Sequence, residues 1–339
     1  MNYHLPSAGD LGPDVVLKAH DGKEWNLRSD AIAGNPIVIL FCPRLTAEGK
    51  QALALFARQS EALAAEGAKM FAITSDKADD DLPEFGFPVL LDRREDVFAR
   101  FSVPRDQIST VVLRRNHHIA GIYKGDQQSQ IGEALAMLKS FGWERTPAVM
   151  PIHPPVLFIP DVFSREDCAR LLDIFENKGQ TFFEPQPAYD LAKGADYKMR
   201  IPEHMREDRI DHFFFEKGTV EFLKNRMNRI YPEIYKAFHY RITKYETLRI
   251  ARYEGHRGGH SHGHRDNIPP WVYRRFALSI NLNTPDFEGG DLRFPEFGEQ
   301  RYRPDSGTAV VFSSSLLHEA MHVTAGRRYV FLAFLFGDI

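Results

Sequence analysis

Gly263-His264-Arg265-Asp266-Asn267, taken together with the distant His318, is the segment from which the organisation of the chain follows. Successive side chains of a strand point to opposite faces, so we expect His264 and Asp266 to share one face. An imidazole nitrogen and a carboxylate oxygen can then meet one small cation. His318 lies 54 residues after His264 (318 − 264 = 54), at the end of an apolar run over 308–317 that predicts a buried strand. The three side chains form a candidate metal site.

Two histidines and one carboxylate occupy one side of an octahedron and leave the other positions for substrate and oxygen. This facial triad is typical of non-haem Fe(II) sites, whereas a structural zinc site is normally closed by four protein ligands. We therefore predict iron, held by His264, Asp266 and His318. Three further histidines in the region are more typical of a solvated loop than of ligands: His256, His260 and His262.

These residues lie in a longer pattern that resembles the 2-oxoglutarate/Fe(II) dioxygenases of the prolyl 4-hydroxylase type. His-x-Asp is followed by His318-Glu319 and then by Val-Thr-Ala-Gly-Arg-Arg-Tyr at 323–329. The stretches 278–283 and 287–294 between the ligands are also similar to that family. The resemblance covers about residues 151–339 and implies a double-stranded β-helix, or jelly roll, with the metal at its mouth.

The resemblance also implies a binding site for 2-oxoglutarate. Arg328 lies ten residues after His318, the family's spacing for a salt bridge to the distal carboxylate, and a guanidinium suits that partner. Arg327 and Arg328 alternate on the final strand, so we expect Arg327 at the surface. Tyr253 matches a tyrosine that hydrogen-bonds the cosubstrate. Asn281 stands where many members have a tyrosine, and either contacts 2-oxoglutarate or only ends a strand.

Composition narrows the remaining classes of function. A chain of 339 residues is long enough for two domains. Its net charge of −3 argues against nucleic-acid and membrane-surface binding. No apolar run approaches the roughly 20 residues of a membrane span, and the first residues lack the features of a signal peptide. The two cysteines, Cys42 and Cys168, predict no disulfide scaffold and favour a reducing, cytoplasmic location.

Residues 1–145 predict a separate α/β domain. Strand patterns alternate with helix patterns, and a hairpin and a helix follow, which favours a sheet covered on both faces. The expected strands are 36–41, 69–74, 87–91, 109–113 and 119–123, and the last helix is 130–141. Three prolines between 147 and 155 predict a linker at about 143–152.

This first domain resembles a thioredoxin-like domain of the peroxiredoxin type over about residues 7–142, on the segments 38–43 and 71–76. The family places its nucleophilic cysteine three residues after a threonine, at a helix N-terminus that lowers the thiol pKa. Here Gly49 occupies that position after Thr46. Cys42 lies at a strand end, where a small buried side chain needs no reactive role.

Three local expectations bear on the site. Ser164 should cap a helix over 165–177 in a pattern close to a capping box. The segment 220–237 predicts one helix, and the charged segment 198–210 predicts a loop at the surface or facing the substrate.

The resemblance implies an enzyme that uses Fe(II), 2-oxoglutarate and O₂, with ascorbate as an optional reductant, and releases succinate and CO₂. Its substrate would be a peptide or protein side chain, or an amino-acid-like molecule, hydroxylated at a C–H bond. We expect the N-terminal domain to recruit a peptide or protein substrate. The alternatives are a thiol-dependent peroxidase or redox adaptor acting through Cys42, and a non-catalytic iron-sensing protein.

Overall fold

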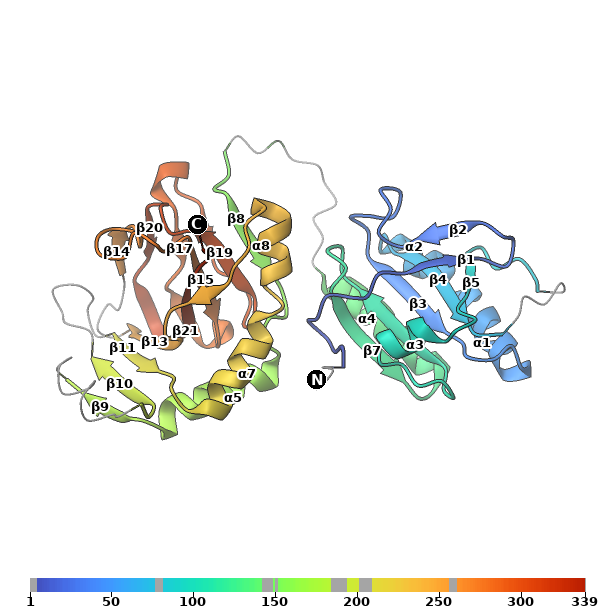
Figure 1. Ribbon diagram of the computed structural model, residues 1–339, viewed down its shortest axis with the longest axis horizontal. Coiled ribbons are helices and arrows are strands. Elements are labelled where there is room, and N and C mark those ends of the chain that lie inside the picture. The colour runs from blue at the N-terminus through green and yellow to red at the C-terminus, as the bar shows by residue number, and fades with distance from the viewer. Residues whose placement is uncertain are drawn as a thin grey trace. The chain divides into compact units, whose positions relative to one another are not determined.

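The computed structural model describes residues 5–76, 82–141, 149, 152–183, 194–200, 209–255 and 261–338, with the backbone alone at 261–262. The chain divides into two compact units, Met1–Pro147 and Ala148–Ile339 (Figure 1). Most of the expected linker at 143–152 lies outside the described residues.

The N-terminal unit is built on a five-stranded sheet in the order β5-β4-β3-β6-β7. β3, β4 and β5 run parallel, whereas β6 and β7 are antiparallel to their neighbours. Every residue of β3 is buried, as expected for a strand covered on both faces. The strands are β3 (Ile37–Phe41), β4 (Lys69–Thr74), β5 (Val89–Leu91), β6 (Ser109–Leu113) and β7 (Ile119–Lys124), with a separate hairpin of β1 (Val16–Lys18) and β2 (Glu24–Asn26).

Two apolar clusters lie on the two faces of this sheet. One joins the sheet to α1, α2 and α4 through residues such as Phe56, Leu63 and Ile131. The other joins it to α3 and to the segment around the hairpin, through residues such as Phe98 and Leu27. The predicted α/β sheet with both faces covered is confirmed. The helices are α1 (Ala47–Arg58), α2 (Ser60–Ala65), α3 (Asp96–Arg100) and α4 (Gln127–Ser140).

The described residues of the C-terminal unit form two sheets. The larger has the order β8-β19-β15-β21-β13-β11-β10-β9, with β12 and β16 also paired to β21, and the smaller has the order β14-β20-β17-β18. The larger sheet contains β8 (Val156–Ile159), β9 (Gln180–Phe182), β10 (Tyr197–Arg200), β11 (Ile210–Phe213), β12 (Lys244–Tyr245), β13 (Arg249–Glu254), β15 (Phe276–Asn281), β16 (Phe287–Gly289), β19 (Ala309–Ser313) and β21 (Val323–Phe336). The smaller contains β14 (Ser261–His264), β17 (Leu292–Arg293), β18 (Arg301–Tyr302) and β20 (His318–Ala320).

An apolar cluster joins the two sheets. Leu292 and Phe294, from β17 and its end, pack with Phe312 and Phe334 from the larger sheet. A second cluster packs helices against the larger sheet, through residues such as Leu171. Two sheets packed through one core, without a closed barrel, form the predicted jelly roll. The helices of this unit are α5 (Arg165–Asn177), α7 (Lys217–Met227) and α8 (Tyr231–Phe238), with short 3₁₀ turns η2 (Thr284–Asp286) and η3 (Pro295–Phe297).

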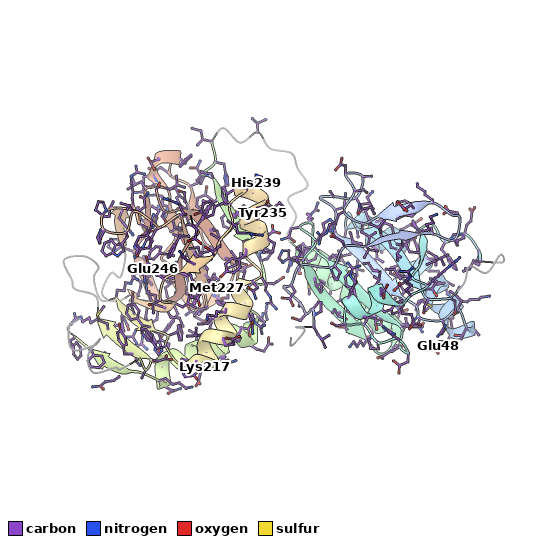
Figure 2. All side chains as sticks on the ribbon, in the orientation of Figure 1. Glu48, Lys217, Met227, Tyr235, His239 and Glu246 are labelled. Atoms are coloured by element: carbon purple, nitrogen blue, oxygen red, sulfur yellow. The ribbon has the colours of Figure 1, made fainter. Side chains whose placement is uncertain are left out.

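Two expectations about this unit are wrong in part. The single helix predicted over 220–237 is two helices: Lys217 and Met227 bound α7, and Tyr235 belongs to α8 (Figure 2). Pro232 lies in the first turn of α8, where its missing N–H costs nothing, whereas it would break the interior of one long helix. The loop predicted over 198–210 contains the end of β10 and the start of β11, which pair antiparallel. Residues 201–208 lie outside the described residues.

Among the described residues, every helix is too short or too polar to cross a membrane.

The N-terminus of α5 generates a prediction about stability. The Ser164 side chain accepts a hydrogen bond from the Asp167 N–H, and the Asp167 carboxylate accepts one from the Ser164 N–H. Ser164→Ala should therefore lower the free energy of unfolding of the C-terminal unit by about 1 kcal/mol. Pulse proteolysis in urea, with fragments identified by mass spectrometry, measures this unit separately. Ser164→Thr keeps the acceptor oxygen and should recover most of the loss; equal stability of the alanine variant would contradict the prediction.

Candidate metal centre

Antiparallel pairing of β14 with β20 brings the two histidines together. His264 ends β14, His318 begins β20, and they are directly opposite in the register. Their ring centroids are 4.5 Å apart. The run 308–317 was expected to be one strand ending at His318, but β19 stops at Ser313 and a turn follows. That turn moves His318 from the larger sheet to the smaller one, where it can face His264.

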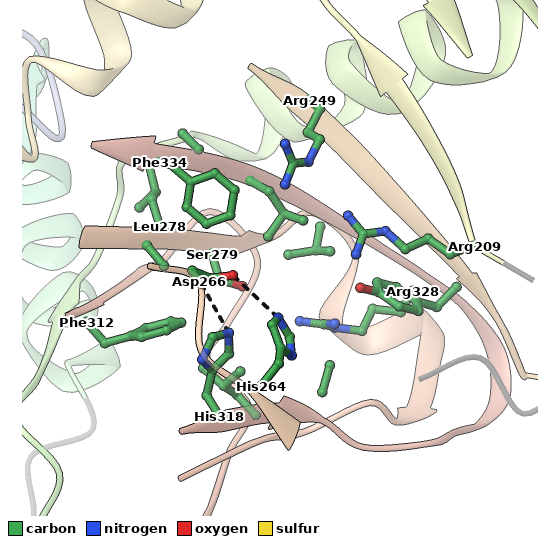
Figure 3. A pocket seen from close by; sticks show the side chains of 17 residues that line it. Arg209, Arg249, His264, Asp266, Leu278, Ser279, Phe312, His318, Arg328 and Phe334 are labelled. Carbon is green, nitrogen blue, oxygen red and sulfur yellow. Dashed lines mark ion pairs between the residues drawn. The ribbon is translucent and has the colours of Figure 1, made fainter. Parts of the chain in front are cut away.

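Asp266 completes the cluster from the turn after β14. The strand ends at His264, so the two ligands do not lie on one strand as expected, although the carboxylate still faces both imidazoles (Figure 3). Its Oδ1 is 3.4 Å from His264 Nε2 and its Oδ2 is 3.3 Å from His318 Nε2. The backbone N–H of Asp266 donates to the Ser314 carbonyl at 2.9 Å, which ties this turn to the end of β19.

The surroundings keep both kinds of ligand in the protonation state that a cation requires. Burial lowers the pKa of His318, so its ring stays neutral, and its Nδ1 lies 3.0 Å from the Leu316 carbonyl. Donation from Nδ1 leaves the Nε2 lone pair directed at the cluster. Burial alone would raise the pKa of Asp266, but the hydrogen bond from His264, together with nearby positive charge such as that of Arg274, outweighs it, and the pKa is lowered. Asp266 is therefore an anion.

The geometry fits one metal ion. One ligand atom from each of His264, Asp266 and His318 lies within 4.8 Å of the others. Two ligand atoms about 2.1 Å from an ion and at right angles to each other are about 3.0 Å apart, close to the 3.3 and 3.4 Å between Asp266 and the histidines. Within the described ranges, no fourth histidine, cysteine or carboxylate joins the cluster. Asp266 and His318 are both buried, while His264 borders the opening.

The cluster opens into a cavity between the two sheets, and Arg328 lines it (Figure 3). Tyr253 also lines this cavity. Tyr253 on β13 is opposite Arg328 on β21, and the guanidinium carbon lies 5.6 Å from the centre of the tyrosine ring. Burial lowers the pKa of Arg328 to about 10, so the side chain is still a cation at neutral pH. Arg327 points the other way, with its side chain 56% exposed and its Nε 3.2 Å from Glu254.

Two asparagines hold Arg328 in place. Arg328 Nε donates to Asn281 Oδ1 at 3.0 Å, so Asn281 contacts the arginine and does not line the cavity. Asn283 accepts from the Tyr329 N–H and donates to the Arg327 carbonyl, which fixes the backbone on both sides of Arg328. Gly290 leaves room for the side chain, since a Cβ there would lie 2.7 Å from Arg328 Cδ.

Sequence reasoning missed two arginines that line the cavity, Arg209 and Arg249. Arg209 was assigned to a charged loop, but it is 1% exposed and donates to both carboxylate oxygens of Asp211, at 2.5 and 2.7 Å. Arg249 lies four residues before Tyr253 on the same strand, so the alternation that placed Tyr253 could also have placed Arg249 inside. No local sequence pattern indicates that Arg209 lines the cavity, because its position depends on the pairing of β11 with β13.

The comparisons with known proteins agree with the division into two units. Residues 248–336 match the 2OG-Fe(II) oxygenase superfamily, and residues 8–122 match the AhpC/TSA family. The two resemblances inferred from the sequence are thereby confirmed, including the thioredoxin-like character of the N-terminal unit.

Individual relatives cover parts of the chain. A PKHD-type hydroxylase of Alteromonas mediterranea is 38% identical over 65 residues, which are 18% of this chain and 28% of that protein. The chain thus matches little more than a quarter of the length of this curated relative. A Pseudomonas putida prolyl-4-hydroxylase structure covers 55% of this chain and 94% of its own, with 16% identity and a TM-score of 0.40. The Mycobacterium tuberculosis peroxidoxin BcpB covers 40% and 98%, with 20% identity and a TM-score of 0.37.

The cluster generates a prediction about metal binding. His264→Ala, Asp266→Ala or His318→Ala should weaken Fe(II) binding by more than about 100-fold, because loss of even an outer partner of a ligand costs 10–100-fold. Anaerobic calorimetric titration with Fe(II) measures the affinity and the stoichiometry. His322→Ala is the matched control, because this exposed side chain lies four residues after His318. Unchanged affinity in His318→Ala would show that the ligand assignment is wrong.

Proposed function

We propose that this protein is an Fe(II)- and 2-oxoglutarate-dependent dioxygenase that hydroxylates a C–H bond of its substrate. One observation carries the proposal: a cluster of two histidines and an aspartate, with His318 and Asp266 buried, shares a cavity with the buried cation of Arg328. Among the described residues, Asp291 is a nearby acid whose charge acts on that cation, but Asp291 is itself paired with Arg303. An anionic cosubstrate that binds beside the metal would neutralise Arg328.

His264, Asp266 and His318 would hold the iron, since three ligands of this kind leave positions for other molecules. Bound Fe(II) supplies the O₂ chemistry that couples conversion of 2-oxoglutarate to succinate and CO₂ with hydroxylation of a C–H bond. The atoms balance: one oxygen atom of O₂ enters the substrate as a hydroxyl group, and the other enters succinate.

The remaining residues orient the cosubstrate and exclude water. Arg328, held by Asn281, would pair with the distal carboxylate of 2-oxoglutarate, and Tyr253 would line the same end of the cavity. The walls are apolar near the cluster, where Phe312, Leu292 and Phe334 line the cavity. A dry wall strengthens the charge interactions inside and protects reactive species from water.

The peroxidase alternative conflicts with the chemistry of the N-terminal unit. Burial raises the pKa of Cys42 to about 12, and its thiol donates to the Arg44 carbonyl at 3.3 Å. A reactive thiol requires the thiolate at neutral pH. Gly49 cannot be replaced by the missing cysteine without movement, because a Cβ there would lie 2.1 Å from the Arg44 carbonyl oxygen. We propose instead that this unit recruits a peptide or protein that carries the hydroxylated side chain.

The cosubstrate site generates the third prediction. Arg328→Ala should raise the 2-oxoglutarate concentration needed for half-maximal succinate formation by about tenfold or more, because a hydrogen bond to a charged group contributes about 1.5–3 kcal/mol. Succinate is measured with Fe(II), 2-oxoglutarate and ascorbate. Arg327→Ala is the control, because its side chain is exposed and pairs with Glu254. A larger effect of Arg327→Ala than of Arg328→Ala would show that the carboxylate anchor was assigned to the wrong face of β21.

The fourth prediction concerns the N-terminal unit. Deletion of residues 1–145 should preserve succinate formation without substrate and weaken hydroxylation of a recruited peptide or protein, provided circular dichroism shows that the remainder is folded. Cys42→Ser in the full chain should change neither rate. Peroxide reduction that requires Cys42 and a recycling thiol would instead support the peroxidase alternative.

A further inference from the structure

The cavity carries more positive charge than a 2-oxo acid can neutralise. Arg209, Arg249 and Arg328 all line it, and among the described residues Asp211 is the acid within ion-pair distance of any of them. Asp291 acts on Arg328 from further away, but it is paired with Arg303. The carboxylate of Asp266 belongs to the metal cluster. If one arginine is matched by Asp211 and one by the cosubstrate, the third is available for a further anion.

Asp211 is committed to Arg209. The two side chains form a bidentate pair with both oxygens engaged, and each side chain is 3% exposed or less. Burial would lower the pKa of Arg209, but Asp211 outweighs that effect and the pKa is raised. The charge of Arg209 is therefore compensated within the protein, without a further anion.

Arg249 also contacts Asp211, but less closely than Arg209 does. Its Nε lies 3.3 Å from Asp211 Oδ2, but no described residue accepts a hydrogen bond from that Nε. Glu246 is the other acid that acts on Arg249, but Arg274 donates to both of its carboxylate oxygens, at 2.5 and 2.6 Å. The Arg249 side chain is 14% exposed, and burial, followed by the charges of Arg209 and Arg274, lowers its pKa despite Asp211. A buried cation with so little compensation is costly unless an anion joins it.

The position of Arg249 separates it from the cosubstrate anchor. On the interior face of the larger sheet, Arg328 is opposite Tyr253 and Arg249 is opposite Leu332. The second pair lies four residues away from the first on each of the two antiparallel strands. Four residues correspond to roughly 13 Å between backbone positions. Both guanidinium groups point into the cavity from different parts of its wall (Figure 3). Ser279 on β15 lies opposite Leu332 on β21 and adds a hydroxyl to the cavity lining near Arg249.

We propose that the substrate of this enzyme carries a carboxylate that pairs with Arg249, while 2-oxoglutarate occupies Arg328. This inference rests on the proposed function and specifies its substrate class: a carboxylic acid, which is either a free amino or organic acid or the carboxylate of a peptide. The carboxylate enters beside Phe334, whose ring centre lies 5.1 Å from the Arg249 guanidinium carbon. The pair then fixes the substrate relative to the metal cluster.

The test compares acids with their neutral amides. Full-length protein loaded with Mn(II) and 2-oxoglutarate is titrated calorimetrically with a panel of free amino, hydroxy and dicarboxylic acids, with their amides, and with peptides that have free or amidated C-termini. The same compounds are added to the Fe(II) enzyme, and succinate and oxygenated product are measured. We expect at least one acid to bind and to stimulate succinate formation, with its amide at least tenfold weaker. Preference for the free acids or for the peptides identifies the source of the carboxylate.

Variants assign the effect to the arginine. Arg249→Gln should raise the dissociation constant of the acid at least tenfold while Mn(II) and 2-oxoglutarate still bind, and Arg249→Lys, which keeps the charge, should recover part of it. Arg252→Gln is the control on the opposite face of β13, where Arg252 pairs with Glu254 at 2.9 Å, and should stay within twofold. Equal binding of acids and amides, no binding of any acid, or an Arg249→Gln variant like the wild type would overturn the proposal. Failure of 2-oxoglutarate to yield any succinate would instead overturn the proposed function.

Discussion

The pairing of two short strands, β14 and β20, is the constraint on which the site depends. It places His264 directly opposite His318, although 54 residues separate them in the chain, and leaves Asp266 in the turn that follows. Apolar packing between the two sheets supports this contact. The apolar cluster around Phe294 and Phe312 keeps the two sheets together, and Phe312 lies 4.6 Å from the His318 ring, centre to centre. A ligand pair set by backbone pairing is brought together by the fold itself, without a metal.

Local periodicity accounts for what the sequence predicted well. Alternation along a strand distinguishes neighbouring residues, and the structure buries Arg328 and exposes Arg327 as the alternation indicates. The strand–helix alternation of the N-terminal unit was also sufficient, because each of its central strands contains at least three consecutive apolar residues. The break at Pro232 could have been predicted, since proline is tolerated in the first turn of a helix and not in its interior.

Long-range pairing accounts for what sequence reasoning missed. Arg209 follows a charged segment and has the appearance of a loop residue, but β11 pairs with β13 and carries it to the inside, where Asp211 compensates it. Asn283 could not be recognised either, because its role is to bind the backbone of a strand more than 40 residues later, on either side of Arg328. Such roles follow from which strands are neighbours, and no short pattern encodes that.

The length of β21 has a consequence for how this domain can change in evolution. This strand runs from Val323 to Phe336 and pairs with β12, β13, β15 and β16, so its register is fixed against four neighbours at once. A substitution changes one side chain, but an inserted or deleted residue would turn every later side chain to the opposite face. Such a change near Arg327 would exchange an interior arginine for a surface one and turn Phe331 and Leu335 out of the core that they now fill. Lineages that carry this domain can therefore vary the composition of the strand far more freely than its length.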